Sequence, residues 1–115
     1  MPQNEIEKNE SKANDKLVSV TQPEAPVSEV DVRIDNRLGL HARAAARFVH
    51  LANRFESTIH VSKAGSRVDG KSILGLLTLA ACKGTRLRLV ASGVDEDQAL
   101  AELSALVRDR FGEES

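Results

Sequence analysis

The chain has 115 residues with 16 basic and 17 acidic side chains, which gives a formal net charge of −1 at neutral pH. This length suffices for one domain, the near-neutral charge does not support nucleic-acid binding, and no apolar stretch is long enough to span a membrane. The single cysteine, Cys82, excludes an internal disulfide and favours a cytoplasmic location.

Residues 1–29 differ in composition from the rest of the chain. They hold all three prolines, no glycine, no aromatic residue, and six acidic side chains against three lysines. Such a segment cannot bury enough apolar surface to offset the entropy that it would lose on ordering. We therefore predict a disordered acidic N-terminal tail at residues 1–29, followed by one domain at residues 30–115.

The first half of the predicted domain reads as a strand, a helix and a hairpin. Residues 30–34 alternate apolar and polar side chains, as a half-buried strand does. Residues 42–53 change to a helical period, with apolar side chains recurring every three or four positions. Residues 58–62 alternate again, and the turn at residues 63–66 leads to a return strand that begins at Arg67.

The second half predicts a short helix, a strand and a longer helix. Ser72 precedes the apolar run 73–79 and is a favourable helix cap. Residues 85–91 alternate, and the last helix opens with an expected Asp95/Gln98 capping box. The order β-α-β-β-α-β-α, with one polar face on every strand, predicts an α+β fold in which helices cover one face of an antiparallel sheet.

The stretch RLGLHARAA, residues 37–45, places His41 where a strand leads into a helix. The first N–H groups of a helix, here those of Ala42, Arg43 and Ala44, lack intrahelical partners and can hold a phosphate. The Arg43 guanidinium can also bind phosphate oxygens, and Gly39 lets another molecule approach closely. These residues indicate that the His41 imidazole attacks phosphorus, but a lone histidine at such a junction is also commonly a polar surface residue.

The other candidate reactive side chains lack such neighbours. His50 and His60 are expected to be surface or structural residues. The histidines do not have metal-ligand spacing and Cys82 has no cysteine partner, so neither a metal site nor a cofactor is predicted, and Cys82 is expected to be buried. The absence of GxxxxGK[ST] and GxGxxG motifs argues against bound ATP or a dinucleotide.

Two motifs resemble those of the histidine-containing phosphocarrier protein (HPr) family of the bacterial phosphotransferase system. GLHARAAARFV, residues 39–49, is similar to the active-site segment of the family, and GKSILGLLTLAACKG, residues 70–84, is similar to its regulatory-serine helix. The 31-residue spacing from His41 to Ser72 is also that of the family. The resemblance covers about residues 30–111 and implies an HPr-like open-faced β-sandwich with strand order 1-4-2-3.

The resemblance implies a stoichiometric phosphoryl carrier and not an enzyme with its own turnover. His41 would take a phosphoryl group on Nδ1 from enzyme I charged by phosphoenolpyruvate, and would pass it to a histidine of a IIA-type acceptor protein. Arg43 would help to hold and release the group. Ser72 would be a regulatory site for an HPr kinase/phosphorylase. A cytoplasmic monomer that binds neither nucleic acid nor membrane is expected.

The surface for these partners is expected where the first two helices meet, with an apolar centre surrounded by basic residues. For Leu74 and Leu77, packing in the core is the open alternative, because a short helix buries one side and exposes the other. The residues expected on this surface are Leu40, Arg43, Arg47, Phe48, Lys71, Leu74 and Leu77.

The chain departs from the common family pattern at two positions. Ala44 replaces the proline of the usual His-x-Arg-Pro motif, and its N–H can either donate to phosphate or continue the helix. Leu38 stands where many sugar-transporting members carry serine or asparagine, which favours the nitrogen-related, regulatory branch of the family. The alternative function is a regulatory binding module that docks on targets according to the phosphorylation state of Ser72 or His41.

Overall fold

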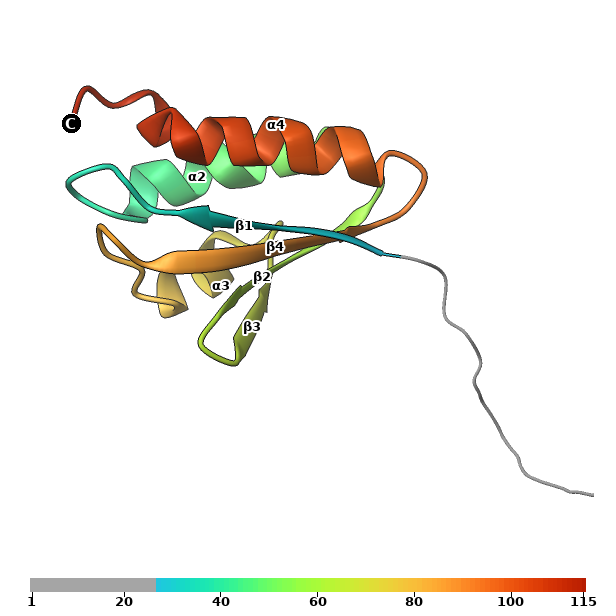
Figure 1. Cartoon of the computed structure of the whole chain (residues 1–115), viewed down its shortest axis with the longest axis horizontal. Coiled ribbons are helices and arrows are strands. Elements are labelled where there is room, and N and C mark those ends of the chain that lie inside the picture. Colours follow the sequence, from blue (N-terminus) through green and yellow to red (C-terminus); the bar gives the residue numbers. More distant parts are fainter. Residues whose placement is uncertain (1–26) are drawn as a thin grey trace, which may run out of the picture.

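The computed structural model describes residues 27–115, which form a four-stranded antiparallel sheet and three helices (Figure 1). The sheet has the order β1-β4-β2-β3, which confirms the expected order 1-4-2-3. The elements are β1 (Ser28–Arg33), α2 (Ala42–Ala52), β2 (Thr58–Lys63), β3 (Ser66–Asp69), α3 (Ile73–Thr78), β4 (Arg86–Ser92), α4 (Glu96–Arg108) and a 3₁₀ turn, η1 (Arg110–Gly112).

The predicted boundary between tail and domain lies close to the first described residues. β1 begins at Ser28, two residues before the predicted start of the domain at residue 30. Most of the predicted tail, residues 1–26, lies outside the described residues. The turn η1 is an element that no periodicity predicted, because it contains a single turn after the last helix.

The register of the sheet collects apolar side chains on one face. Leu89 on β4 has Val30 opposite on β1 and Val61 opposite on β2. Side chains that lie directly opposite in an antiparallel pair point to the same face. These three therefore form an apolar row across the sheet, and Leu89 and Val61 are almost completely buried.

Helices α2 and α4 lie together over this apolar face, while α3 contacts α2 and β3 (Figure 1). The apolar stripe of α2 supplies Phe48, Val49 and Ala52 to the core, and α4 supplies Leu103 and Val107. Burial of each large aliphatic side chain stabilises the fold by about 1.5–3 kcal/mol. Of the helices in residues 27–115, none has the length and apolar character that a membrane crossing requires.

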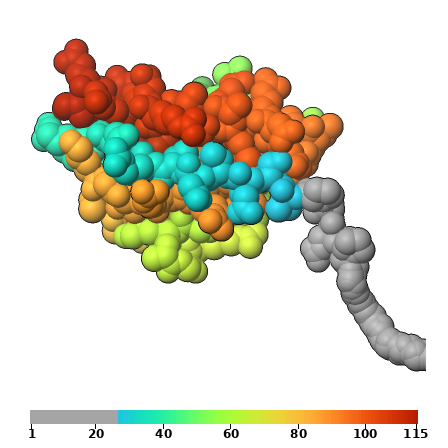
Figure 2. All heavy atoms as spheres, in the orientation of Figure 1, coloured from blue at the N-terminus to red at the C-terminus, as the bar shows by residue number. Residues whose placement is uncertain are grey.

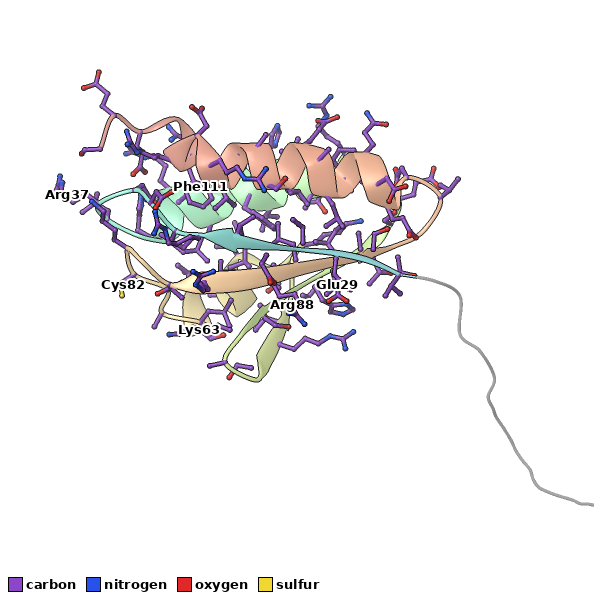
Figure 3. All side chains as sticks on the ribbon, viewed as in Figure 1. Glu29, Arg37, Lys63, Cys82, Arg88 and Phe111 are labelled. Atoms are coloured by element: carbon purple, nitrogen blue, oxygen red, sulfur yellow. The ribbon has the colours of Figure 1, made fainter. Side chains whose placement is uncertain are left out.

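The opposite face of the sheet is polar and open to solvent. Arg88 on β4 pairs with Asp31 at 3.0 Å and with Glu29 at 3.4 Å, both on β1. Figure 3 labels Arg88 and Glu29 on these neighbouring strands. All three side chains are more than half exposed, so the ion pairs contribute little to stability and mainly keep this face soluble.

The predicted capping box at the start of α4 is wrong. Asp95 stands at the N-cap position, but its side chain does not cap the helix; the carboxylate instead accepts hydrogen bonds from the backbone N–H of Glu56 at 2.9 Å and of Ser57 at 3.0 Å, and from the Ser57 hydroxyl. Ser57 is 1% exposed, so its polar groups need a protein partner. Asp95 thereby ties the segment before β2 to the start of α4.

Asp95→Asn is expected to destabilise the fold at neutral pH, because an amide replaces one of the two acceptor oxygens by a donor. The hydrogen bond from the Ser57 side chain, followed by that from the Glu56 backbone, lowers the pKa of Asp95. Because the pKa of Asp95 is lower in the folded than in the unfolded protein, its ionised carboxylate stabilises the fold at pH values above its unfolded-state pKa, which is near 4. This stabilisation is lost as the pH falls through the folded-state pKa.

Urea unfolding at pH 7 and pH 3 tests this expectation. The midpoints of the wild type and of Asp95→Asn should differ clearly at pH 7 and converge at pH 3. Asp109→Asn is the control, because the Asp109 carboxylate has no hydrogen-bond partner within residues 27–115. A constant gap between the wild type and Asp95→Asn at both pH values contradicts the assigned role of the charge.

Candidate functional site

His41 is the N-cap of α2, as the sequence predicted. Its backbone is extended, with φ −78° and ψ 179°, and its carbonyl accepts the first intrahelical hydrogen bond from the Ala45 N–H at 2.8 Å. The imidazole Nδ1 faces the helix and accepts from the Arg43 N–H at 3.3 Å. Nδ1 therefore lies at the end of α2 where N–H groups without intrahelical partners and the helix dipole favour negative charge.

The loop before His41 rests on the chain that follows α3. The Leu40 N–H donates to the Ala81 carbonyl at 2.8 Å, and Gly39 adopts φ +70°. A Cβ on Gly39 would lie 2.6 Å from the Ala81 oxygen and 2.9 Å from the Cys82 Cα. The close approach expected at Gly39 is thus made by the backbone of this chain, which fixes the position of the loop that carries His41.

The C-terminal segment turns back toward the same loop. Arg110, Phe111 and Gly112 adopt successive φ values of +58°, +55° and +82°. The Phe111 side chain is 1% exposed, and its carbonyl accepts a hydrogen bond from Arg47 Nη1. Figure 3 shows Phe111 under the end of α4, toward the end of the molecule that carries Arg37.

One further contact completes this arrangement. The Arg37 N–H donates to the Ser115 carbonyl at 3.0 Å. Figure 2 shows the last residues of the chain lying against the segment that precedes α2. The C-terminal residues are therefore part of the wall around His41.

Glu113 is a side chain in contact with His41 that the sequence interpretation did not identify. Its Oε2 pairs with His41 Nε2, and its Oε1 accepts from Asn36 Nδ2 at 3.0 Å. Because a carboxylate only accepts, Nε2 carries the proton and Nδ1 keeps its lone pair. The residue follows Gly112, where the helical pattern has ended, so no periodicity or motif indicated it.

The electrostatic surroundings keep Glu113 ionised. Burial by itself raises the pKa of Glu113, but the hydrogen bonds from His41 and Asn36 and the positive charge of Arg47 outweigh it. The net effect lowers the pKa below its ordinary value. His41 and Glu113 are 27% and 18% exposed in their side chains, so the pair is shielded but a partner can still reach the ring.

A hollow of about 350 Å³ opens beside His41. Arg43 lines it, is exposed, and forms no hydrogen bond or ion pair through its guanidinium within residues 27–115. Such a group can bind the oxygens of a phosphoryl group directly. The hollow is lined by Arg37, Leu38, His41, Arg43, Arg47 and the segment 112–115.

Ser72 caps α3, as predicted. Its hydroxyl oxygen accepts from the Gly75 N–H at 2.9 Å, and its backbone is extended. Ser72 is partly exposed, so a kinase can approach it, although its hydroxyl oxygen is engaged in the cap. The geometry establishes the cap; the regulatory role of Ser72 remains a prediction.

Two of the residues expected at the centre of the partner surface are instead part of the core. Leu40 and Phe48 are 6% and 2% exposed, because the phase of α2 and the Leu40–Ala81 contact turn both side chains inward. In α3, Leu76 is the buried side chain and Leu77 is partly buried, while Leu74 is 76% exposed. Among the exposed apolar side chains, Leu38 lines the hollow beside His41, and Ile73 and Leu74 lie on α3.

The basic residues expected around that surface differ in their availability. Lys71 Nζ donates to the Phe55 carbonyl at 2.7 Å, near the end of α2. Arg47 donates to the Phe111 carbonyl, whereas Arg43 is free within the described part of the chain. Of these three, Arg43 is therefore the one whose guanidinium is available to an incoming anion.

The remaining candidate side chains lie elsewhere. His50 is exposed on α2, and His60 lies on β2 beside the Arg67 guanidinium at 3.0 Å. Cys82 is exposed, which corrects the expectation that it is buried, because the turn after α3 directs it outward. Residues 27–115 contain no group of three histidine, cysteine or acidic side chains able to hold a metal ion.

Comparison with known proteins points to one family. A family model described as "PTS HPr component phosphorylation site" matches residues 28–109. Phosphocarrier protein HPr of Neisseria meningitidis serogroup A is 49% identical over 82 residues, which are 71% of this chain and 92% of that protein. The HPr-like protein Crh of Bacillus subtilis is 47% identical over 81 residues, which are 70% of this chain and 93% of that protein.

A solved structure agrees with these relatives. The crystal structure of HPr from Thermoanaerobacter tengcongensis matches with a TM-score of 0.74 and 43% sequence identity. The match covers 76% of this chain and 99% of that one. The similarity therefore extends over nearly the whole length of the related proteins.

Proposed function

Because the chain belongs to the HPr family of phosphocarrier proteins of the bacterial phosphotransferase system, we propose that His41 is the residue that carries the phosphoryl group. An HPr protein is a phosphocarrier and not a catalytic enzyme, so each molecule takes up and passes on one group at a time. The observation that supports His41 is the placement of its Nδ1 at the N-terminus of α2, beside the free guanidinium of Arg43.

The geometry indicates a separate role for each residue of the site. Nδ1 holds the lone pair that attacks phosphorus, because Nε2 is engaged by Glu113. The first N–H groups of α2, at Ala42, Arg43 and Ala44, precede the first intrahelical hydrogen bond and favour an anion there. Ala44 is completely buried as a side chain, so it contributes through its backbone alone.

The partners follow from the same proposal. Enzyme I of the phosphotransferase system supplies the phosphoryl group, and a IIA-type protein with an acceptor histidine receives it. Leu38 lines the hollow with Arg43, and the exposed Ile73 and Leu74 lie on α3, which packs against α2, so these side chains offer apolar surface near a basic edge for these proteins. The leucine at position 38, where many sugar-transporting members carry serine or asparagine, favours a relay of the nitrogen-related, regulatory kind.

A transfer assay tests this proposal. The purified chain is incubated with enzyme I and labelled phosphoenolpyruvate, and the label is followed on the protein. We expect stoichiometric labelling that is labile in acid and stable in alkali, the behaviour of a phosphohistidine. Absence of label, with an enzyme I that charges another HPr in the same experiment, contradicts the proposal.

A regulatory binding module is the second candidate function. The observation that favours it is the 47% identity to the HPr-like protein Crh together with the partly exposed Ser72 at the cap of α3. A phosphate on Ser72 would place negative charge next to the exposed Leu74 and Ile73. That charge would weaken docking of an acidic partner and favour docking of a basic one.

Ser72→Asp is expected to slow phosphoryl transfer from enzyme I about tenfold. A negative charge at the rim of a docking surface lowers the rate of association with an acidic partner. Ser72→Asn is the matched control, since asparagine and aspartate are comparably good helix caps and differ in charge. Transfer rates for the two variants are measured side by side. Equal rates for Ser72→Asp and Ser72→Asn contradict control by charge at this position.

A further inference from the structure

We propose that Glu113 is a positioning residue for phosphoryl transfer at His41, and that its carboxylate balances the charge of the imidazole ring when the ring carries the phosphoryl group. This inference rests on the function proposed above. It assigns a role to a residue outside residues 28–109, the part of the chain that the family model matches.

The carboxylate is held at both oxygens. One oxygen pairs with His41 Nε2, and the other accepts from Asn36 Nδ2 at 3.0 Å. Asn36 is completely buried and also donates to the Gly39 carbonyl at 2.7 Å, in the loop that carries His41. Asn36, Glu113 and His41 thus form a chain in which each group orients the next, the arrangement that fixes a reactive imidazole in other proteins.

The backbone that delivers Glu113 is strained. Arg110 and Phe111 adopt left-handed φ values of +58° and +55°, which residues other than glycine rarely adopt. The buried Phe111 side chain and the Arg47 hydrogen bond to its carbonyl hold this turn in place. Strained backbone persists where the surrounding structure imposes it and clusters at functional sites. Here the turn brings Glu113 against the imidazole.

The charge that Glu113 balances arises on the imidazole ring during the transfer step. The Nδ1 lone pair leaves its hydrogen bond with the Arg43 N–H and attacks the phosphorus of the phosphohistidine on enzyme I. The Nδ1–P bond forms, the P–N bond of the donor breaks, and its electron pair stays on the donor nitrogen. The proton remains on Nε2, so the phosphorylated ring is cationic and lies against the Glu113 carboxylate. Onward transfer reverses these changes, and no proton has to move.

The other charged groups around the hollow oppose a cationic ring. Arg37, Arg43 and Arg47 line it, and Glu114 is the other acidic side chain on its wall. Without the Glu113 charge, these arginines would favour loss of the Nε2 proton from the phosphorylated ring. A lower pH would then be needed to keep the ring protonated, which is the form that releases the phosphoryl group readily.

Glu113→Gln tests the role of the charge, because glutamine keeps an acceptor oxygen but is neutral. For phosphorylation by enzyme I we expect kcat to fall about tenfold with KM unchanged, the effect of losing one charge-assisted hydrogen bond. The pH of half-maximal hydrolysis of the phosphohistidine should fall by about one unit. Glu56→Gln, an exposed acid away from the site, should match the wild type in both measurements.

The two proposals fail in different ways. If the wild type takes up no phosphoryl group, the proposed function fails, and nitrogen NMR of the unphosphorylated His41 ring still tests the pairing. We expect the Nε2-protonated form to dominate in the wild type and to lose its preference in Glu113→Ala. An unchanged ring spectrum in Glu113→Ala, or a Glu113→Gln variant with the kcat and pH profile of Glu56→Gln, overturns the role of Glu113.

Discussion

Replacing His41 with alanine is expected to reduce phosphoryl uptake from enzyme I to the level of a blank without the protein. Nδ1 of His41 is the nucleophile in the proposed step, and no other group at the start of α2 can replace it. Alanine also removes the helix cap, which costs about 0.5–2 kcal/mol of stability. His41→Asn is therefore the sharper variant, because asparagine caps a helix well and cannot carry the group.

Two other histidines supply the controls for this experiment. His50 is exposed on α2, and His60 on β2 lies beside Arg67. Neither lines the hollow or contacts Glu113. His50→Asn and His60→Asn should take up the group as the wild type does. Labelling that survives in folded His41→Asn and disappears in one of these variants would place the acceptor elsewhere.

Gly39→Ala is expected to cost about 2–4 kcal/mol of stability and to slow phosphoryl uptake in the molecules that remain folded. The left-handed φ of +70° is unfavourable for alanine, and the added Cβ would lie 2.6 Å from the Ala81 oxygen. That oxygen belongs to the backbone and accepts from the Leu40 N–H, so it cannot move without moving the loop. The displaced loop carries His41 away from its place at the cap of α2.

Gly84→Ala separates the cost of the left-handed φ from the cost of the close contact with Ala81. Gly84 also has a left-handed φ, of +91°, but nothing lies within 4 Å of the Cβ position. This variant should lose only about 1–2 kcal/mol, the cost of the backbone conformation, and keep wild-type uptake. Urea unfolding gives both stability changes, and the enzyme I assay gives the rates. Similar losses in Gly39→Ala and Gly84→Ala would show that the close contact with Ala81 does not matter.

Much of the fold was predictable because its signals are local. The alternation in each strand indicated which face is buried, since successive side chains of a strand point to opposite faces. Ser72 was correctly identified as a cap because serine before an apolar run has a local physical reason to be there. The strand order came from the resemblance to the HPr family, and the structure confirms it.

The capping box at Asp95 shows where a local signal misleads. The spacing to Gln98 was correct, but Ser57, far away in the sequence, is buried and competes for the same carboxylate. The partner surface shows the same limit. Periodicity placed Phe48 on an apolar stripe and could not tell whether that stripe faces a partner or the core.

The sequence by itself determined the residue types around one histidine and their spacing along the chain: His41 at a helix start, Arg43 two residues later, and Ser72 at the next cap. Only the tertiary structure decided what holds the imidazole. The pair between His41 and Glu113 joins residues 72 positions apart, and it depends on a strained turn anchored by the buried Phe111. Such a contact leaves no local pattern, because it arises only when α2 and α4 pack on the same face of the sheet.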